Sequence, residues 1–167
     1  MNKKRYIGSG IAVTVLVLGA TIFVGKGSLP TIQNNNGESM KVSNKADTSR
    51  ILTNKKTPYL EFSQEEYQKA VSSGKIIYLE FYANWCPICR AQEPELITGL
   101  DALNRDDLVA FRVNFKDDQT DEYEKALAQT YKVPYQHHKI VLKDNVVIID
   151  SAENWDAQMV TEELSKL

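Results

Sequence analysis

The sequence predicts an α/β fold in which residues 58–167 form one mixed β-sheet with helices on both of its faces. Apolar runs of strand length alternate with segments of helical composition, which is typical of parallel strands joined by helices. The last two apolar runs are separated only by the turn at residues 143–145, which predicts an antiparallel hairpin. A parallel beginning and a hairpin at the end together indicate a mixed sheet.

The first strand and helix of this region have clear end signals. Residues 58–62 can form a short strand. Ser63 is followed three residues later by Glu66, which is the pattern of a capping box for a helix over residues 64–73. Gly74 is a residue that commonly ends a helix.

The remaining elements continue the alternation. Residues 75–82 form an apolar run of the length of a buried strand, and the helix after it begins at a pair of cysteines and reaches about Asn104. The other expected elements are a strand at 108–115, a helix at 121–131, hairpin strands at 140–142 and 146–150, and a closing helix at 156–167. The predicted order is βαβαβαββα.

The N-terminal segment has the pattern of a membrane-directing sequence. Lys3, Lys4 and Arg5 precede Ile7–Val24, a stretch of 18 residues without a charge. As a helix this stretch would span about 27 Å, close to the hydrocarbon thickness of a bilayer. The basic flank predicts that the N-terminus lies inside and the remaining chain outside. We expect residues 1–24 to be an uncleaved transmembrane anchor; the alternative is a cleaved signal peptide and a secreted protein.

A flexible linker is expected between this segment and the folded domain. Residues 25–57 contain no aromatic side chain and are rich in Asn, Ser, Lys and Gly, so they cannot build a core. The chain has 167 residues, is 43% hydrophobic and 25% charged, and has a formal net charge of −2. These values fit one globular domain, which we expect to be monomeric, and exclude the basic field that a nucleic-acid partner requires.

The two cysteines of the chain lie together in the motif Trp85-Cys86-Pro87-Ile88-Cys89. On the first turn of a helix, the first sulfur lies beside free backbone N–H groups and the positive end of the helix dipole, which favour the thiolate. We therefore expect Cys86 to be the exposed, attacking cysteine. Cys89 is nearly one helical turn away, close enough to attack a mixed disulfide and release the product. The motif predicts thiol–disulfide exchange, because a structural bridge across so small a loop would add little stability.

The element order and the cysteine motif together resemble the thioredoxin superfamily, over roughly residues 58–167. Trp85 directly before the first cysteine and Glu80 six residues before it stand where thioredoxins carry an aromatic and an acidic residue. Pro94 stands where the family kinks its active-site helix. With a Glu at this position in place of the usual Asp, the chain more closely resembles the membrane-tethered, extracytoplasmic thioredoxin-like proteins.

The resemblance implies a role for each residue of the motif. Cys86 resembles the attacking cysteine and Cys89 the buried resolving cysteine. Trp85 is expected to shield the site and contact partners, with a place in the core as the alternative. Pro87 and Ile88 are expected to contact the substrate and to influence the reduction potential, and Pro87 is also a good first residue for a helix.

A second proline completes the resemblance. Val133-Pro134 lies 48 residues after Cys86 and ahead of the hairpin, and Pro134 looks like the family's cis-proline, which lies against the cysteine pair. In the family the backbone before this proline, here Val133, pairs with an extended substrate chain. The alternative is an ordinary loop proline with a trans bond.

Glu80 is the third candidate catalytic residue. A carboxylate inside an apolar strand is costly to bury in its ionised form, so its pKa is expected to rise. Such a group can accept the proton of the resolving thiol through a water and return it. The alternative is a carboxylate that faces solvent. If Glu80 is buried alone, Glu80→Gln should leave the protein equally or more stable.

The chain departs from the family after Pro134, where Tyr135-Gln136-His137-His138-Lys139 delays the next strand by about three residues. His137 and His138 could tune the charge of the sulfur or bind zinc together with the cysteines. Adjacent side chains on a strand point to opposite faces, so both histidines cannot readily reach one ion. No metal site and no cofactor are predicted.

The combined interpretation is a membrane-anchored, extracytoplasmic thiol–disulfide oxidoreductase acting on exported or cell-surface proteins. We expect a membrane or extracytoplasmic redox partner. The direction stays open, because reductants and oxidants on this fold differ by roughly 150 mV. The alternative is a non-catalytic binding or accessory module that holds an exported partner along Val133 and Pro134.

Overall fold

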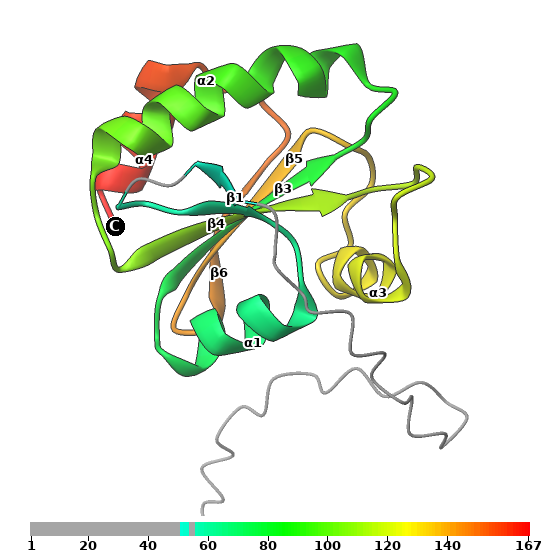
Figure 1. Cartoon of the computed structure of the whole chain (residues 1–167), viewed down its shortest axis with the longest axis horizontal. Coiled ribbons are helices and arrows are strands. Elements are labelled where there is room, and N and C mark those ends of the chain that lie inside the picture. Colours follow the sequence, from blue (N-terminus) through cyan, green and yellow to red (C-terminus); the bar gives the residue numbers. More distant parts are fainter. Residues whose placement is uncertain (1–50, 54–55) are drawn as a thin grey trace, which may run out of the picture. The chain divides into compact units, whose positions relative to one another are not determined.

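The computed structural model describes residues 51–53 and 56–167 (Figure 1). The expected anchor over residues 1–24 lies outside the described residues, as does the linker up to residue 50. Within the described part of the chain, no helix combines the length and the apolarity needed to cross a bilayer.

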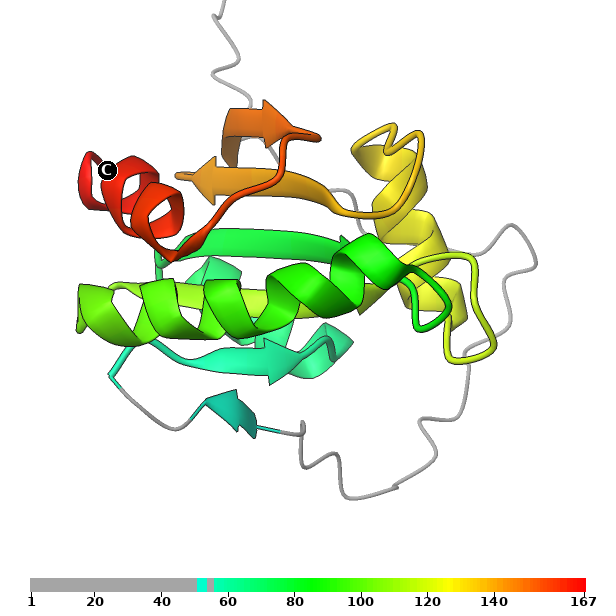
Figure 2. The same ribbon diagram turned by 90° about the horizontal axis from the view of Figure 1, so that it is seen from above.

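Six strands form one sheet in the order β1-β2-β4-β3-β5-β6 (Figure 1, Figure 2). β4 pairs in parallel with both β2 and β3, whereas the other pairings are antiparallel. The elements in chain order are β1 (Ile51–Thr53), β2 (Tyr59–Glu61), α1 (Gln64–Ser72), β3 (Ile76–Tyr82), α2 (Pro87–Leu103), β4 (Leu108–Asn114), α3 (Glu122–Thr130), β5 (His138–Lys143), β6 (Val146–Ser151) and α4 (Ala157–Ser165).

The predicted α/β class and mixed sheet are confirmed, with α1 and α3 on one face and α2 and α4 on the other (Figure 1). Alternate residues of the central strand β3 supply two separate cores. Ile77, Leu79 and Phe81 pack with α1 and α3, whereas Ile76 and Tyr78 pack with α2 and α4. The face of β3 that carries Ile76 and Tyr78 is therefore covered by α2, the helix that begins at the cysteines.

Two structured features lie before residue 58. β1 lies inside the segment that composition indicated to be a linker, and it pairs with β2. Thr57 is also buried, and its hydroxyl both donates to the carbonyl of Arg105 and accepts from its N–H, each at 2.9 Å. A three-residue edge strand is too short to show a hydrophobic period, so composition alone could not reveal it.

The strand expected at residues 140–142 is longer in the structure. β5 begins at His138, because Lys139 pairs with Glu80 and His138 with Phe81 in the antiparallel register of β3 and β5. The delay after Pro134 is therefore a loop of residues 134–137 rather than a shortened strand.

Gly99 allows α2 and α4 to approach closely behind the site. A Cβ atom on Gly99 would lie 2.6 Å from Cβ of Val160 and 2.8 Å from the carbonyl oxygen of Ala157. Both distances are shorter than contact, and one neighbour is backbone that cannot rotate away. The packing of α4 against α2 thus requires a residue without a side chain at this position.

We expect Gly99→Ala to lower the free energy of unfolding by about 1–3 kcal/mol, as overpacking in a dense core does. Thr98→Ala is the matched control, because Thr98 is exposed on the same helix. Its effect should stay within about 0.5 kcal/mol. Urea unfolding of the parent and both variants measures this, and equal midpoints for the parent and Gly99→Ala would show that the two helices can separate freely.

Candidate active site

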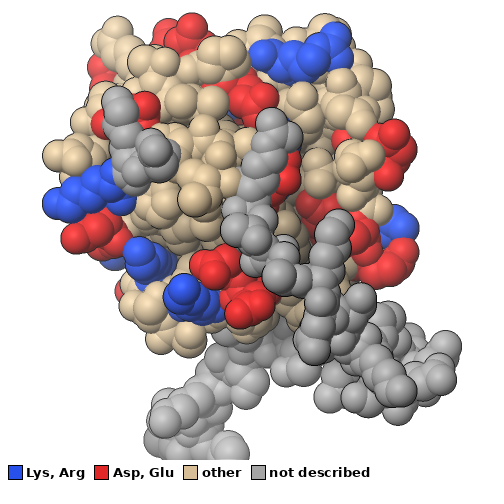
Figure 3. Space-filling model, viewed as in Figure 1, with Lys and Arg blue, Asp and Glu red and all other residues tan. Residues whose placement is uncertain are grey.

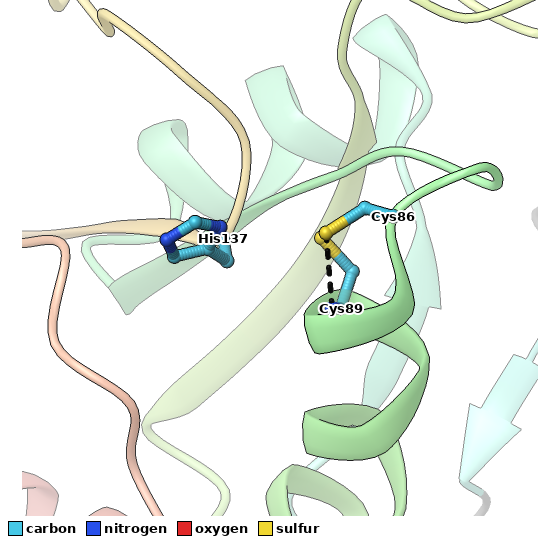
Figure 4. Close-up of side chains that lie close together, drawn as sticks. All are labelled: Cys86, Cys89 and His137. Carbon is cyan, nitrogen blue, oxygen red and sulfur yellow. Dashed lines mark hydrogen bonds between the residues drawn. The ribbon is translucent and has the colours of Figure 1, made fainter.

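The site is built where β3 ends and α2 begins. Cys86 is the N-cap residue of α2, and Pro87 follows as the first helical residue. The sulfur of Cys86 accepts a hydrogen bond from the backbone N–H of Cys89 at 3.2 Å (Figure 4). This contact uses an N–H that has no partner inside the helix, and it favours negative charge on the Cys86 sulfur.

Both cysteines are free thiols and both are buried. Cys86 is 1% exposed and Cys89 is 2% exposed, so the expectation that Cys86 is the exposed thiol is wrong. Tyr82 and Ala83 pack with the two cysteines in one small cluster. The difference between the two thiols therefore lies in their electrostatic surroundings and not in their accessibility.

Cys89 is held in its protonated form. Burial raises the pKa of the Cys89 thiol to about 12, with further contributions from a hydrogen bond with Cys86 and from the charge of Glu80. At neutral pH this thiol cannot act as a nucleophile until a base removes its proton. A base within reach is thus a requirement for any reaction in which Cys89 attacks.

Glu80 lies on the face of β3 that is covered by α2 and is 4% exposed, so the alternative of a solvent-facing carboxylate is excluded. Burial raises the pKa of Glu80 above its ordinary value, while Lys139 and the hydroxyl of Tyr78 oppose the rise. Tyr78 donates to Oε2 of Glu80 at 2.8 Å. The other oxygen, Oε1, is buried without a hydrogen-bond partner among the described residues.

Lys139 is a part of the site that the sequence analysis missed. This buried side chain places Nζ 3.7 Å from Oε2 of Glu80. Nζ also donates to the carbonyl of His137 at 3.0 Å and to Oε1 of Gln92 at 3.2 Å. The sequence did contain a signal for this pair: Lys139 lies at the start of an apolar strand. A buried ammonium group needs a buried partner of opposite charge.

A cavity of about 10 Å³ connects these groups. Its lining includes Glu80, Cys89, Lys139 and Gln92, together with aromatic side chains on the face of the sheet that α2 covers. This is about the smallest cavity that can hold one water molecule, and its polar lining supplies the partners that a buried water needs. The same small cavity therefore borders both Glu80 and Cys89.

Exposed apolar side chains surround the buried sulfurs. Trp85 and Ile88 flank Cys86 in the sequence and are both exposed, and the indole N–H of Trp85 donates to the carbonyl of Lys116 at 3.2 Å. Tyr135 is also exposed, and its ring centroid lies 5.4 Å from that of His137. Trp85 is thus anchored at its nitrogen and presents its ring at the surface rather than in the core.

The second proline does not have the expected geometry. The described residues contain no cis peptide bond, so the Val133–Pro134 bond is trans. Val133 is buried in the core beside α3, with its N–H bonded to the carbonyl of Ala128, and Pro134 is exposed. A substrate contact of Val133 and Pro134 stays a prediction. The residue that the structure brings against the cysteine pair is His137 (Figure 4).

The two histidines point in different directions. Nε2 of His138 lies 2.6 Å from a carboxylate oxygen of Asp150. His137 instead has one ligand atom within 4.8 Å of those of Cys86 and Cys89. Among the described residues, Cys86, Cys89 and His137 form the group of histidine, cysteine and acidic side chains that could hold a metal ion.

Known proteins match this chain in sequence and in fold. The family model named Thioredoxin matches residues 58–160. The chain belongs to the thioredoxin family. It is 36% identical over 80 residues to an H-type thioredoxin of Fagopyrum esculentum, and the match covers 48% of this chain and 62% of that relative.

Solved structures are similar to the thioredoxin domain. One is Trxlp from Edwardsiella tarda, with a TM-score of 0.51, 31% identity and coverage of 62% of this chain and 95% of that one. A mutant thioredoxin of Halobacterium salinarum also gives a TM-score of 0.51, at 20% identity over 65% of this chain and 87% of that one, which shows the fold alone. The chain spans less than two thirds of the plant thioredoxin's length.

We expect the two thiols of the thioredoxin domain to differ in reactivity. At pH 7 a small alkylating reagent should modify Cys86 at least about tenfold faster than Cys89, since the raised pKa of Cys89 leaves almost no thiolate. Mass spectrometry of the reduced protein at timed intervals measures both rates. Equal rates in the folded protein would contradict the assignment, and Cys86→Ser gives the rate of Cys89 alone.

The ion pair reverses the expected effect of Glu80→Gln. That substitution leaves the ammonium of Lys139 buried and unpaired, so it should destabilise the thioredoxin domain by about 3–5 kcal/mol rather than stabilise it. The double variant Glu80→Gln with Lys139→Met should recover most of this loss, because it removes both charges. Urea unfolding of the parent, both single variants and the double variant gives the coupling, and additive effects would show that the pair is not formed.

Proposed function

We propose that this thioredoxin domain is a thiol–disulfide oxidoreductase that acts on exported or cell-surface proteins. The observation that supports this function best is the pairing of a protonated resolving thiol, Cys89, with a buried carboxyl group, Glu80, around one water-sized cavity. A merely structural cysteine pair has no need of a buried proton acceptor.

The reaction begins at Cys86. Its thiolate attacks one sulfur of a substrate disulfide, the substrate S–S bond breaks, and the leaving sulfur takes up a proton. Cys89 then loses its proton and attacks the sulfur of Cys86. The mixed disulfide breaks, the second substrate thiolate leaves and is protonated, and the domain holds a Cys86–Cys89 disulfide. Two electrons have passed from the domain to the substrate, and the same steps in reverse oxidise a substrate dithiol.

Glu80 is the proton acceptor in this scheme. A water in the shared cavity takes the proton of Cys89 as its thiolate forms and passes one to Glu80. The negative charge of Glu80 raises the pKa of Cys89, so proton transfer to Glu80 removes the charge that opposes thiolate formation. Lys139 lowers the pKa of that carboxyl and so favours its ionised form, which is the form that accepts the proton.

A polypeptide is the substrate that the surface fits. Trp85, Ile88 and Tyr135 offer exposed apolar area around the buried sulfurs. Acidic and basic side chains are both scattered over the face shown in Figure 3. The same apolar surface supports the second candidate, a binding module that holds an exported partner without exchanging its disulfides.

The location proposed for the domain rests on the N-terminal sequence. Lys3, Lys4 and Arg5 before the uncharged stretch Ile7–Val24 favour a single membrane anchor with the domain outside the cytoplasm. Secretion after cleavage is the alternative. In either location the domain meets exported proteins, and a membrane or extracytoplasmic redox partner would return it to its starting state and set the direction of the reaction.

Single-turnover reduction of a small disulfide tests the function. Cys86→Ser should abolish the reaction, and Cys89→Ser should stop it at a stable mixed disulfide on Cys86. The double variant Glu80→Gln with Lys139→Met should slow the resolving step by about 100-fold or more, the usual contribution of a positioned base. Lys139→Met alone should move the pH dependence of that step upward, because Lys139 lowers the pKa of Glu80.

The outcome also separates the two candidate functions. Loss of the cellular function in Cys86→Ser with Cys89→Ser would support exchange, whereas full retention would contradict it and favour the binding module. If the double variant Glu80→Gln with Lys139→Met resolves the mixed disulfide at the parent's rate throughout pH 6 to pH 9, Glu80 has no part in the mechanism.

A further inference from the structure

His137 brings a nitrogen ligand to the cysteine pair from the opposite side of the site. Cys86 and Cys89 come from the start of α2, whereas His137 directly precedes β5 (Figure 4). One ligand atom from each residue lies within 4.8 Å of the other two. The three residues therefore form a compact set of two sulfurs and one imidazole nitrogen.

The backbone holds His137 in this position. Its N–H donates to the carbonyl of Phe81 at 2.6 Å, which ties the loop to the end of β3 just before the cysteine motif. The φ angle of His137 is 54°, a left-handed conformation that few residues other than Gly and Asn adopt readily. Lys139 adds a second tie by donating to the carbonyl of His137. The imidazole is thus presented to the sulfurs by a fixed backbone.

The ring of His137 is in a suitable state to act as a ligand. Its Nδ1 is buried and has no hydrogen-bond partner among the described residues. Burial, reinforced by the positive charges of Lys139 and His138, lowers the pKa of His137, so the ring is neutral at neutral pH. Metal ions bind the neutral imidazole. His138 instead has its Nε2 beside Asp150, and it is not part of the group formed with the two cysteines.

We propose that the reduced pair Cys86 and Cys89 forms, with His137, a three-ligand site for Zn²⁺. Two thiolates and one imidazole, with a fourth position left open, is a ligand set that zinc uses in proteins. Zinc–ligand bonds of about 2.0–2.3 Å draw the three ligand atoms somewhat closer together than the upper limit in the structure, through small side-chain rotations. On binding, each thiol releases one proton, so one Zn²⁺ replaces two protons and no electron is transferred.

Oxidation and zinc binding exclude each other at this site. A Cys86–Cys89 disulfide has no thiolate to offer, so its formation must release the metal. Zinc in turn occupies both sulfurs and prevents Cys86 from attacking a disulfide. The inference goes beyond the proposed exchange reaction, because it requires only two free thiols and the imidazole.

Metal titration of the full-length chain tests the site directly. The reduced protein is titrated with Zn²⁺ in competition with a chromophoric chelator, and Co²⁺ serves as an optical probe of thiolate ligands. We expect one equivalent of Zn²⁺ and a sulfur-to-cobalt charge-transfer band in the reduced protein. The oxidised protein should show neither.

The matched variants are His137→Asn and His138→Asn. Asn tolerates the left-handed backbone at position 137, so the first variant removes the imidazole and keeps the loop. It should weaken zinc binding by about 100-fold or more, since loss of even an outer-shell partner weakens metal affinity by about 10–100-fold. His138→Asn should change the affinity by less than about threefold, because His138 makes no contribution to the set.

Three results would overturn the proposal: no stoichiometric binding by the reduced protein, equal binding by the oxidised protein, or equal affinity of the parent and His137→Asn. Urea unfolding of His137→Asn verifies that the variant is folded. Disulfide exchange is measured on the same preparations after chelation of metal. Zinc binding without exchange would contradict only the proposed function, and exchange without zinc binding would contradict only the zinc site.

Discussion

The antiparallel register between β3 and β5 determines what lies beneath the cysteine pair. It sets Glu80 opposite Lys139 and Phe81 opposite His138. Because side chains alternate along a strand, a shift by one residue would turn Lys139 into the apolar core beside α1 and α3 and leave Glu80 without a counter-charge. The ion pair thus results from this register. It also disfavours any other register, because a shifted strand would leave a buried charge unpaired.

In the proposed mechanism, the same pair controls the protons of the site. Glu80 and Cys89 are both acids in one buried place, and burial raises the pKa of each. Each negative charge opposes the other, so the state with one shared negative charge is favoured over the state with two. Lys139 supplies the positive charge that makes this single negative charge acceptable in the interior. The proton can then move between the carboxyl and the thiol without leaving a net charge unbalanced.

Local signals were sufficient for most of the fold. The cap at Ser63, the apolar run of β3 and the turn before β6 each act within a few residues, and the predicted elements lie within a few residues of the observed ones. Cys86, Cys89 and the burial of Glu80 could also be predicted, because motif spacing and strand hydrophobicity are local. The edge strand β1 was missed, since it is defined only by its partner.

The rest of the site depends on contacts between distant parts of the chain. Neither the pairing of Lys139 with Glu80 nor the burial of Cys86 has a signature within its own segment. The bond before Pro134, expected to be cis, is trans. Adjacent side chains on a strand point to opposite faces, which makes it difficult for two adjacent histidines to reach one ion. His138, the first residue of β5, turns to Asp150, whereas His137 lies in the loop before the strand and faces the cysteine pair. A loop that ends one residue before the strand therefore places a single imidazole at the dithiol, and the sulfur lone pairs that exchange would use become available to a metal as well.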